Sequence, residues 1–214
     1  MKSVLVIGLG RFGRNTIKKL NELGHQVMAV DEKEDNVNAV LPYVTDALIG
    51  NAANAQFVKT LGIKSFDLCI VAIGDDFQNS LQVTSLLKDM GAAFVVSRAS
   101  SNVHAKFLLR NGADQIIYPE KQLAEWTAIR YSSDHIFDYI ELDNSCAIFE
   151  IEPPESWVGK SISELDIRRR YNLNIVGIKA NGHVIIEINP DMQLKSNDRL
   201  LVAGSIKSIK KCFK

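Results

Sequence analysis

The residues nearest the N-terminus form a glycine-rich turn of the kind that holds phosphate groups. Gly8, Gly10 and Gly13 follow the G-x-G-x-x-G spacing in the stretch GLGRFG, directly after the apolar residues 4–7. The first glycine permits a tight turn, the second lets the backbone approach the phosphates, and the third allows close packing of a helix on a strand. The start of that helix offers unpaired N–H groups and partial positive charge to an anion.

An acidic residue stands where a ribose-binding carboxylate is expected. Asp31 ends the next strand-like run, 18 residues after Gly13. A carboxylate there accepts hydrogen bonds from both ribose hydroxyl groups, and its charge disfavours the 2′-phosphate of NADP. The glycine turn and Asp31 together predict a nucleotide-binding site.

Asn51 follows the third expected strand and has two interpretations. In this fold that loop reaches the adenine edge, where an amide can accept from N6 and donate to N1. Alternatively, Asn51 or Asn54 caps the helix that follows. The sequence leaves both interpretations open, and both can hold at once.

The histidines do not form a recognisable set of acid–base groups. We interpret His25, His104, His135 and His183 as surface or interface residues, because none has the partnered Asp or Lys pattern of a dehydrogenase. We therefore predict a protein that is not an enzyme. A NAD(H)-dependent oxidoreductase or an NAD(H) redox sensor is the alternative.

The elements that position these residues alternate up to about residue 131. Strands are expected over residues 3–7, 26–31, 46–49, 67–73, 94–98 and 115–118, and helices over residues 11–23, 34–41, 55–61, 76–90 and 103–111. Many boundaries carry Gly or Asn, which are helix-stop and turn signals. The alternation predicts an α/β fold with a doubly wound, six-stranded parallel sheet of the Rossmann-like type.

A further helix is expected over residues 120–131, with Leu123, Trp126, Ala128 and Ile129 as its apolar residues. No seventh parallel strand follows it. We expect its apolar face, with that of the following stretch HIFDYI, to dock on another subunit, because exposed apolar faces are unusual for a monomer. Packing on its own sheet is the alternative.

The sequence after residue 132 changes character. Shorter strands are expected over residues 147–152, 175–179, 184–188 and 199–203, with helices over 162–171 and 205–212. Asn181-Gly182 predicts a two-residue hairpin turn. We expect a small α+β C-terminal domain over residues 135–214, after a nucleotide-binding domain over residues 1–134.

The composition limits the choice of partners and compartment. The chain has 25 basic and 25 acidic residues, so its formal net charge of zero gives no support to a nucleic-acid partner. Three distant cysteines without a secretory leader predict a reducing, cytosolic setting. No apolar run reaches the roughly 18 residues that a membrane-spanning helix needs.

Six motifs carry a resemblance to a known family over essentially the whole chain. VIGLGRFG, VMAVDEKEDNVN, IGNA, CIVAIGDD, GADQIIYPEK and ELDIRRRYNLNIVGIK resemble cytosolic RCK (TrkA-type) regulatory subunits of Ktr and Trk potassium-uptake systems. The resemblance implies dimers that assemble into a ring, usually an octamer. It also implies docking under a membrane potassium-translocating subunit, with ATP favouring the active ring and ADP the inactive one.

The resemblance also implies roles for individual residues. Arg11 reaches the terminal phosphate of ATP, Asp31 binds the ribose, and Glu120 helps to hold Mg²⁺ or Ca²⁺ near the terminal phosphates. The competing interpretation of Glu120 is a first-turn acid favoured by the helix dipole. The other nucleotide contacts implied by the motifs are Gly8, Gly10, Phe12, Gly13, Asn51, Ala52, Ala72, Ile73, Gly74 and Arg98.

A second ligand is implied for the C-terminal domain, because Gram-positive members of the family bind cyclic di-AMP there. The matching positions are Ile162, Arg168, Asn174, Ile175 and Pro190. A ligand with twofold symmetry suits an interface between two copies of the domain. Alternatively, the basic residues 168–170 only complement the negative end of a helix.

Overall fold

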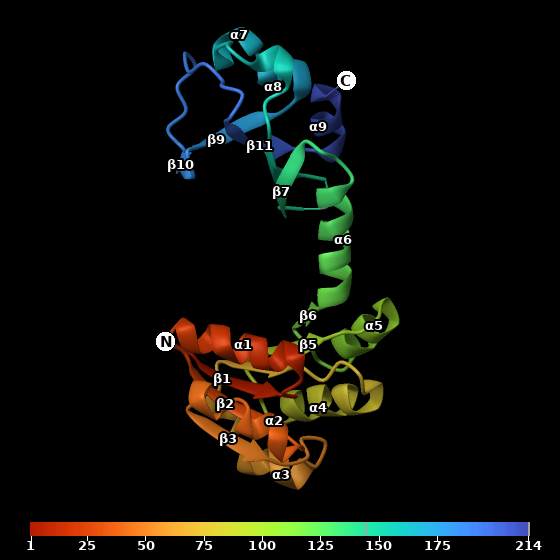
Figure 1. Cartoon of the computed structure of the whole chain (residues 1–214). Coiled ribbons are helices and arrows are strands. Elements are labelled where there is room, and N and C mark those ends of the chain that lie inside the picture. The colour runs from red at the N-terminus through yellow and green to blue at the C-terminus, as the bar shows by residue number, and fades with distance from the viewer. Residues whose placement is uncertain (144, 214) are drawn as a thin grey trace. The chain divides into compact units, whose positions relative to one another are not determined.

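The computed structural model describes residues 1–143 and 145–213 (Figure 1). It has two compact units, Met1–Gln122 and Leu123–Lys214. The division falls inside helix α6 (Pro119–Tyr131), twelve residues before the boundary expected from the sequence. The reason is that Trp126 and Ile129 pack against the core of the second unit.

The first unit contains one parallel sheet of six strands. Its strands are β1 (Ser3–Ile7), β2 (Gln26–Asp31), β3 (Asp46–Ile49), β4 (Leu68–Val71), β5 (Val95–Arg98) and β6 (Gln115–Ile117). Their order is β3-β2-β1-β4-β5-β6, and all five neighbouring pairs are parallel. This is the doubly wound sheet that the sequence predicts, with its order reversing between β1 and β4.

Helices cover both faces of this sheet (Figure 1). They are α1 (Arg11–Glu22), α2 (Glu34–Asn38), α3 (Ala55–Thr60), α4 (Phe77–Asp89) and α5 (Asn102–Arg110), with 3-10 turns η1 (Leu41–Tyr43) and η2 (Ile63–Ser65).

The alternation of side chains along β1 explains how one strand serves two cores. Val4 and Val6 pack in a cluster with Ile17 of α1, whereas Leu5 and Ile7 pack in a cluster with residues of α3 and α4. Buried parallel strands are apolar on both faces for this reason.

The second unit is a small α+β domain, as the sequence predicts. Its antiparallel sheet has the order β10-β9-β11-β8-β7. The strands are β7 (Ile136–Glu141), β8 (Ala147–Ile151), β9 (Asn174–Ala180), β10 (His183–Ile185) and β11 (Arg199–Gly204). The helices are η3 (Glu155–Trp157), α7 (Ile162–Leu165), α8 (Ile167–Tyr171) and α9 (Ile206–Cys212), and Trp157 is the largest fully buried side chain.

Several details of this unit differ from the sequence prediction. The helix expected over residues 162–171 is two helices in the structure. Asp166 has a left-handed backbone conformation, with φ 43°, which interrupts the helix between α7 and α8. The strand expected over residues 184–188 is shorter. The predicted hairpin turn is confirmed, since Asn181 and Gly182 have φ of 50° and 81°.

Strand β7 is missing from the prediction, and its place in the sheet changes the interpretation of HIFDYI. Ile136 and Tyr139 are buried in the second unit's own core, whereas Ile140 is 65% exposed. A register shift between Ile136 and Asp138 interrupts the pairing with β8 and hides the alternation. The apolar stretch is therefore only partly an exposed face.

Candidate nucleotide-binding site

A cavity of about 820 Å³ opens at the carboxyl ends of β1 and β4, where the strand order reverses. This is the position at which doubly wound sheets bind ligands. The nucleotide contacts predicted from the sequence line this cavity, except for Gly13, and Glu120 lines it too. The predicted residues that it unites are Gly8, Gly10, Arg11, Phe12, Asp31, Asn51, Ala52, Ala72, Ile73, Gly74, Arg98 and Glu120.

The glycine turn is shaped by close backbone contacts. Gly8 has φ +92°, and its N–H donates to the Val30 carbonyl at 2.9 Å. A Cβ on Gly8 would press on the backbone of Ala72, and one on Gly13 would overlap the Gly8 carbonyl oxygen. Gly13 therefore lies behind the cavity, where it lets α1 pack closely on β1. Gly10 has open space beside it at the start of α1.

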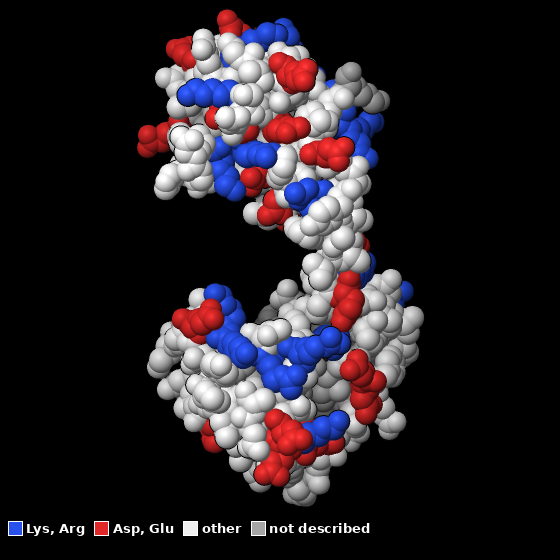
Figure 2. Space-filling view, in the orientation of Figure 1, with Lys and Arg blue, Asp and Glu red and all other residues white. Residues whose placement is uncertain are grey.

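Helix α1 begins at the cavity with favourable electrostatics for an anion. Gly10 is its N-cap, no side chain caps it, and its first turn contains no acidic residue. Figure 2 shows basic side chains over this helix, whose sequence contains Arg11, Arg14, Lys18 and Lys19. Arg11 lines the cavity, whereas Arg14 donates a 3.1 Å hydrogen bond to Asn36.

Asp31 is held in place by three hydrogen bonds. Its Oδ2 accepts from the Leu9 N–H at 2.6 Å, and its Oδ1 accepts from the Lys33 N–H at 2.9 Å and from Asn36 Nδ2 at 3.0 Å. Because a carboxylate has about four acceptor positions, Oδ2 keeps one for a hydroxyl group. The glycine turn and the carboxylate thus form one fixed unit.

The structure distinguishes the two interpretations of Asn51. Asn54 is the N-cap of α3, since its Oδ1 accepts from the N–H groups of Gln56 and Phe57. The Asn51 Oδ1 instead accepts from the Ala53 N–H at 2.7 Å, while Asn51 lines the cavity. The capping role therefore belongs to Asn54.

Arg98 and Glu120 form an ion pair at the wall of the cavity. Arg98 Nη2 donates to Glu120 Oε1, and the two side chains are 17% and 58% exposed. Hydrogen bonds from the Glu120 backbone N–H and from Arg98 lower the pKa of this carboxyl. Glu120 also lies in the first turn of α6, so the dipole interpretation fits its position equally.

The ionisable lining of the cavity has more acids than bases. Arg11, Lys33 and Arg98 are its three basic residues, whereas its five acidic residues are Asp31, Glu32, Asp75, Asp76 and Glu120. No group of three or more potential metal ligands occurs among the described residues. Single carboxylates fit Mg²⁺ or Ca²⁺ only where phosphate oxygens supply further ligands.

His104 overturns the interpretation of the histidines as surface or interface residues. It is fully buried, with Nε2 2.7 Å from Ser80 Oγ and Nδ1 accepting from the Ser100 N–H at 3.2 Å. Burial lowers the pKa of His104. It joins α4 to the loop after β5 and does not line the cavity, nor do the other three histidines.

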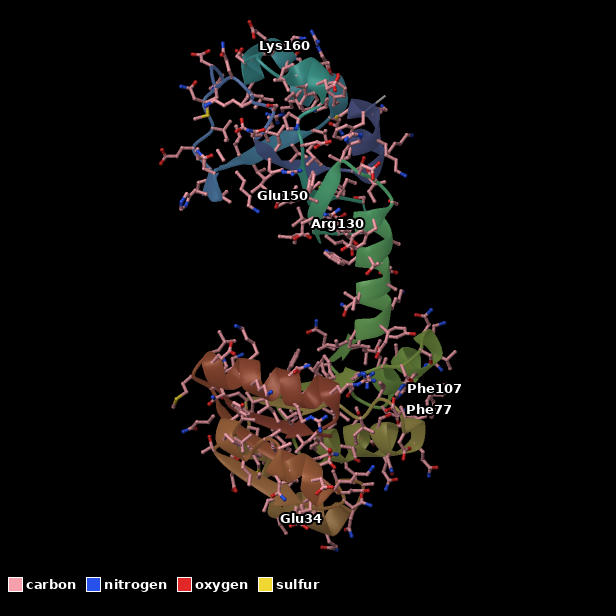
Figure 3. The ribbon with its side chains drawn as sticks, viewed as in Figure 1. Glu34, Phe77, Phe107, Arg130, Glu150 and Lys160 are labelled. Atoms are coloured by element: carbon pink, nitrogen blue, oxygen red, sulfur yellow. The ribbon has the colours of Figure 1, made fainter. Side chains whose placement is uncertain are left out.

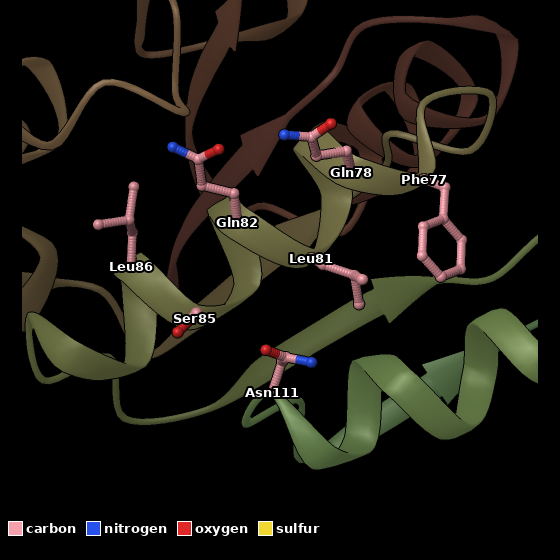
Figure 4. Close-up of a pocket in the computed structure, with 7 residues that line it drawn as sticks. All are labelled: Phe77, Gln78, Leu81, Gln82, Ser85, Leu86 and Asn111. Atoms are coloured by element: carbon pink, nitrogen blue, oxygen red, sulfur yellow. The ribbon is translucent and has the colours of Figure 1, made fainter.

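A second hollow, of about 590 Å³, lies on α4 (Figure 4). No charged side chain lines it among the described residues. Its lining is Phe77, Gln78, Leu81, Gln82, Ser85, Leu86 and Asn111. Phe77 also contacts Phe107 of α5 edge to face, with ring centres 5.9 Å apart (Figure 3). No residue predicted from the sequence to bind a ligand lies here.

The residues expected to bind cyclic di-AMP lie in α7, α8 and β9 and in the segment that contains Pro190. The Ile162 N–H donates to the Met192 carbonyl, and the Ser163 N–H donates to the Pro190 carbonyl at 2.9 Å. These bonds bring Ile162 beside Pro190. Arg168 and Asn174 are exposed on either side of the turn between α8 and β9.

The fold and the cavity define a doubly wound protein with a nucleotide-type site at the reversal of strand order. Residues 4–119 match the family model of the TrkA-N domain, and residues 146–214 match that of the TrkA-C domain. The chain therefore belongs to the TrkA-N domain family, as the six sequence motifs predict. The helices in the described part of the chain are all too short or too polar to span a lipid bilayer.

Two relatives from Bacillus subtilis (strain 168) are similar over almost their full length. The Ktr system potassium uptake protein C is 38% identical over 208 residues, which are 97% of this chain and 94% of the relative. The Ktr system potassium uptake protein A is 37% identical over 210 residues, or 98% and 95% of the two chains.

Solved structures of the GsuK channel share the fold. The channel bound to NAD has a TM-score of 0.70 at 19% identity, over 97% of this chain and 38% of that chain. GsuK bound to ADP has a TM-score of 0.53 at 18% identity, over 60% and 34%.

Proposed function

We propose that this chain is a cytosolic, nucleotide-gated regulatory subunit of a membrane potassium-uptake system, with ATP activating and ADP inactivating. The observation that supports this most strongly is the single cavity that unites Arg11, Asp31 and Glu120 at the start of α1. The similarity to two Ktr potassium uptake proteins over nearly the whole chain supports the transport system.

Each wall of the cavity then has a separate task. The fixed Asp31 carboxylate binds the ribose, the α1 N-terminus and the glycine turn bind phosphates, and Asn51 binds the adenine edge. The Arg11 guanidinium binds the third phosphate by charge-assisted bonds. Glu120 supplies one ligand to Mg²⁺ or Ca²⁺, which neutralises charge between the phosphates and the acidic lining.

The proposal is tested by potassium flux into vesicles. Proteoliposomes that contain the cognate membrane subunit are loaded with this chain and with ATP or ADP on the side where the chain docks. We expect faster uptake with ATP, and uptake with the Asp31→Ala variant that no longer depends on the nucleotide. Equal uptake with ATP and ADP for the unaltered chain would contradict the gating proposal.

A second candidate is an NAD(H)-dependent oxidoreductase or redox sensor. The GsuK channel is bound to NAD, and it has the same fold. No histidine lines the cavity, which argues against hydride transfer with histidine as the acid–base group. Thermal unfolding with ATP, ADP, NAD and NADH separates the two functions, since gating by ATP and ADP requires these two to stabilise the chain more than NAD or NADH.

Assembly into dimers and a ring of eight is part of the proposal. Leu123 and Tyr131 of α6 and Ile140 and Leu142 after it are 58–72% exposed. Such apolar groups are typical of subunit contacts when they occur together. Light scattering is expected to give a mass of eight chains with ATP, and a monomer at micromolar concentration would contradict both the ring and the gating.

We also propose that the second unit binds cyclic di-AMP, which inhibits uptake. Arg168 binds a phosphate, Asn174 and Ile175 bind adenine, and Ile162 and Pro190 complete the site across a twofold interface. Titration calorimetry on the full chain is expected to give one ligand per two chains. Arg168→Ala abolishes that heat and the matched Arg170→Ala variant keeps it, whereas equal heats for both variants contradict the assignment.

A further inference from the structure

Arg98 is a largely buried cation at the cavity wall, and its side chain is 17% exposed. Its guanidinium lies against Gly74 so closely that a Cβ on that glycine would overlap it. Its Nε is buried and has no hydrogen-bond partner among the described residues. Because Nη1 lies against Gly74 and Nε is enclosed, an anion in the cavity approaches this guanidinium at Nη2, the atom that Glu120 occupies.

Glu120 is the more exposed partner in this ion pair. Its side chain is 58% exposed, compared with 17% for Arg98, and it belongs to another element, α6. A carboxylate is the closest chemical match that a protein has to a phosphate oxygen for binding a guanidinium. In the ion pair Glu120 therefore stands where an anionic ligand can stand.

We propose that Glu120 is an internal competitor for Arg98, so that a nucleotide phosphate must displace it before Arg98 can bind the nucleotide. This inference rests on the proposed function of the cavity. Once displaced, Glu120 has lost its cationic partner and faces the incoming phosphates. It is then free to bind a divalent cation, so the nucleotide binds first and the cation second.

The excess of acidic residues in the cavity explains why the nucleotide would bind before the cation. Five acidic and three basic side chains line it, and one of those bases is neutralised by Glu120 in the ion pair. A nucleotide without a cation therefore meets a lining that is net negative. Release of Arg98 supplies one positive charge, and a cation at Glu120 removes one of the negative charges.

The test measures ADP binding by calorimetry in EDTA, so that no cation takes part. Glu120→Gln removes the competitor, and we expect it to raise ADP affinity about five- to tenfold, in line with the strength of a charge-assisted hydrogen bond. Arg98→Gln should lower ADP affinity about tenfold. In the Arg98→Gln background, Glu120→Gln should change ADP affinity by less than about twofold, because there is no cation to release.

Glu32→Gln is the matched control for the loss of one negative charge. Glu32 also lines the cavity, but no ion pair joins it to another residue in the described part of the chain. If Glu120→Gln acts only through net charge, Glu32→Gln will raise ADP affinity as much. Equal gains from the two variants, or an equal gain from Glu120→Gln with and without Arg98, would overturn the proposal.

Terbium luminescence without nucleotide gives an independent measurement, with Tb³⁺ in place of Ca²⁺. We expect weak binding to the unaltered chain and stronger binding to Arg98→Gln, in which Glu120 is free. Unchanged or weaker binding to Arg98→Gln would contradict the competition. If no variant binds ADP, both this inference and the proposed function fail, whereas ADP binding without the expected coupling contradicts this inference alone.

Discussion

The candidate sites of the two units differ in how their charged residues are held. In the first unit, Asp31, Arg98 and Glu120 are fixed by hydrogen bonds or ion pairs around one cavity. In the second unit, residues 168–170 and the three lysines of α9 are exposed, and no ion pair joins them to another described residue. Under the proposed function, the nucleotide site inside one chain has its charges preorganised, whereas the cyclic di-AMP site between two copies gives its cations partners only when the second copy and the ligand bind.

The largest expected effect separates the stability of the second unit from the site in the first. Trp157 is 1% exposed and packs on Tyr171, so Trp157→Ala should destabilise the second unit by about 3–5 kcal/mol. Because the two units have separate cores, ADP affinity should not change. Calorimetric melting and ADP titration check this together, and a parallel loss of ADP affinity would show that the units are not independent.

The next largest effect removes the ribose contact that ATP and ADP share. We expect Asp31→Ala to weaken both nucleotides about a hundredfold, because it removes one charge-assisted hydrogen bond to the ribose and the hydrogen bond from the Leu9 N–H that holds the glycine turn. The exposed Asp35 of α2 does not line the cavity, so Asp35→Ala is the matched control. If Asp31→Ala binds ATP with the affinity of the unaltered chain, Asp31 is not part of the nucleotide-binding site.

A smaller effect distinguishes the two nucleotides. Arg11 is expected to bind mainly the third phosphate, so Arg11→Ala should weaken ATP more than ADP, by about ten- to a hundredfold. Arg14→Ala is the control, because Arg14 is bonded to Asn36 and does not line the cavity. Equal losses for ATP and ADP would reduce Arg11 to a general electrostatic role.

The smallest effect separates a capping residue from a binding residue three positions away. Asn54→Ala should cost about 1 kcal/mol of stability in the first unit, because it removes the N-cap of α3. Nucleotide affinity should stay the same. Asn51→Ala should do the reverse, and denaturant unfolding with nucleotide titration of both variants measures this. If Asn51→Ala lowers the stability and Asn54→Ala does not, the capping role belongs to Asn51 and this assignment is wrong.

The sequence predicts the first unit well because its site rests on backbone constraints. Gly8 has a φ of +92°, and a Cβ on Gly13 would overlap the Gly8 carbonyl oxygen, and such constraints leave a recognisable spacing in the sequence. The six strands follow from their apolar runs and turn residues. Strand β7 was missed because a register shift breaks its alternation, and the break at Asp166 depends on a single backbone angle.

Side-chain pairs between distant elements leave no such local signal. Arg98 and Glu120 are 22 residues apart, and His104 is 24 residues from Ser80. Nothing in the spacing of these residues shows that the folded sheet brings them together. The burial of His104 and the pairing of Arg98 therefore became visible only in the structure.

Competition between ATP and ADP tests the central claim most directly. The unaltered chain is saturated with ADP and titrated with ATP and then with NADH in a calorimeter, with Mg²⁺ present. We predict one nucleotide per chain and full displacement of ADP by ATP, with NADH unable to displace either at equal concentration. Simultaneous binding of ATP and ADP, or displacement of both by NADH, would contradict an ATP and ADP site at the carboxyl ends of β1 and β4.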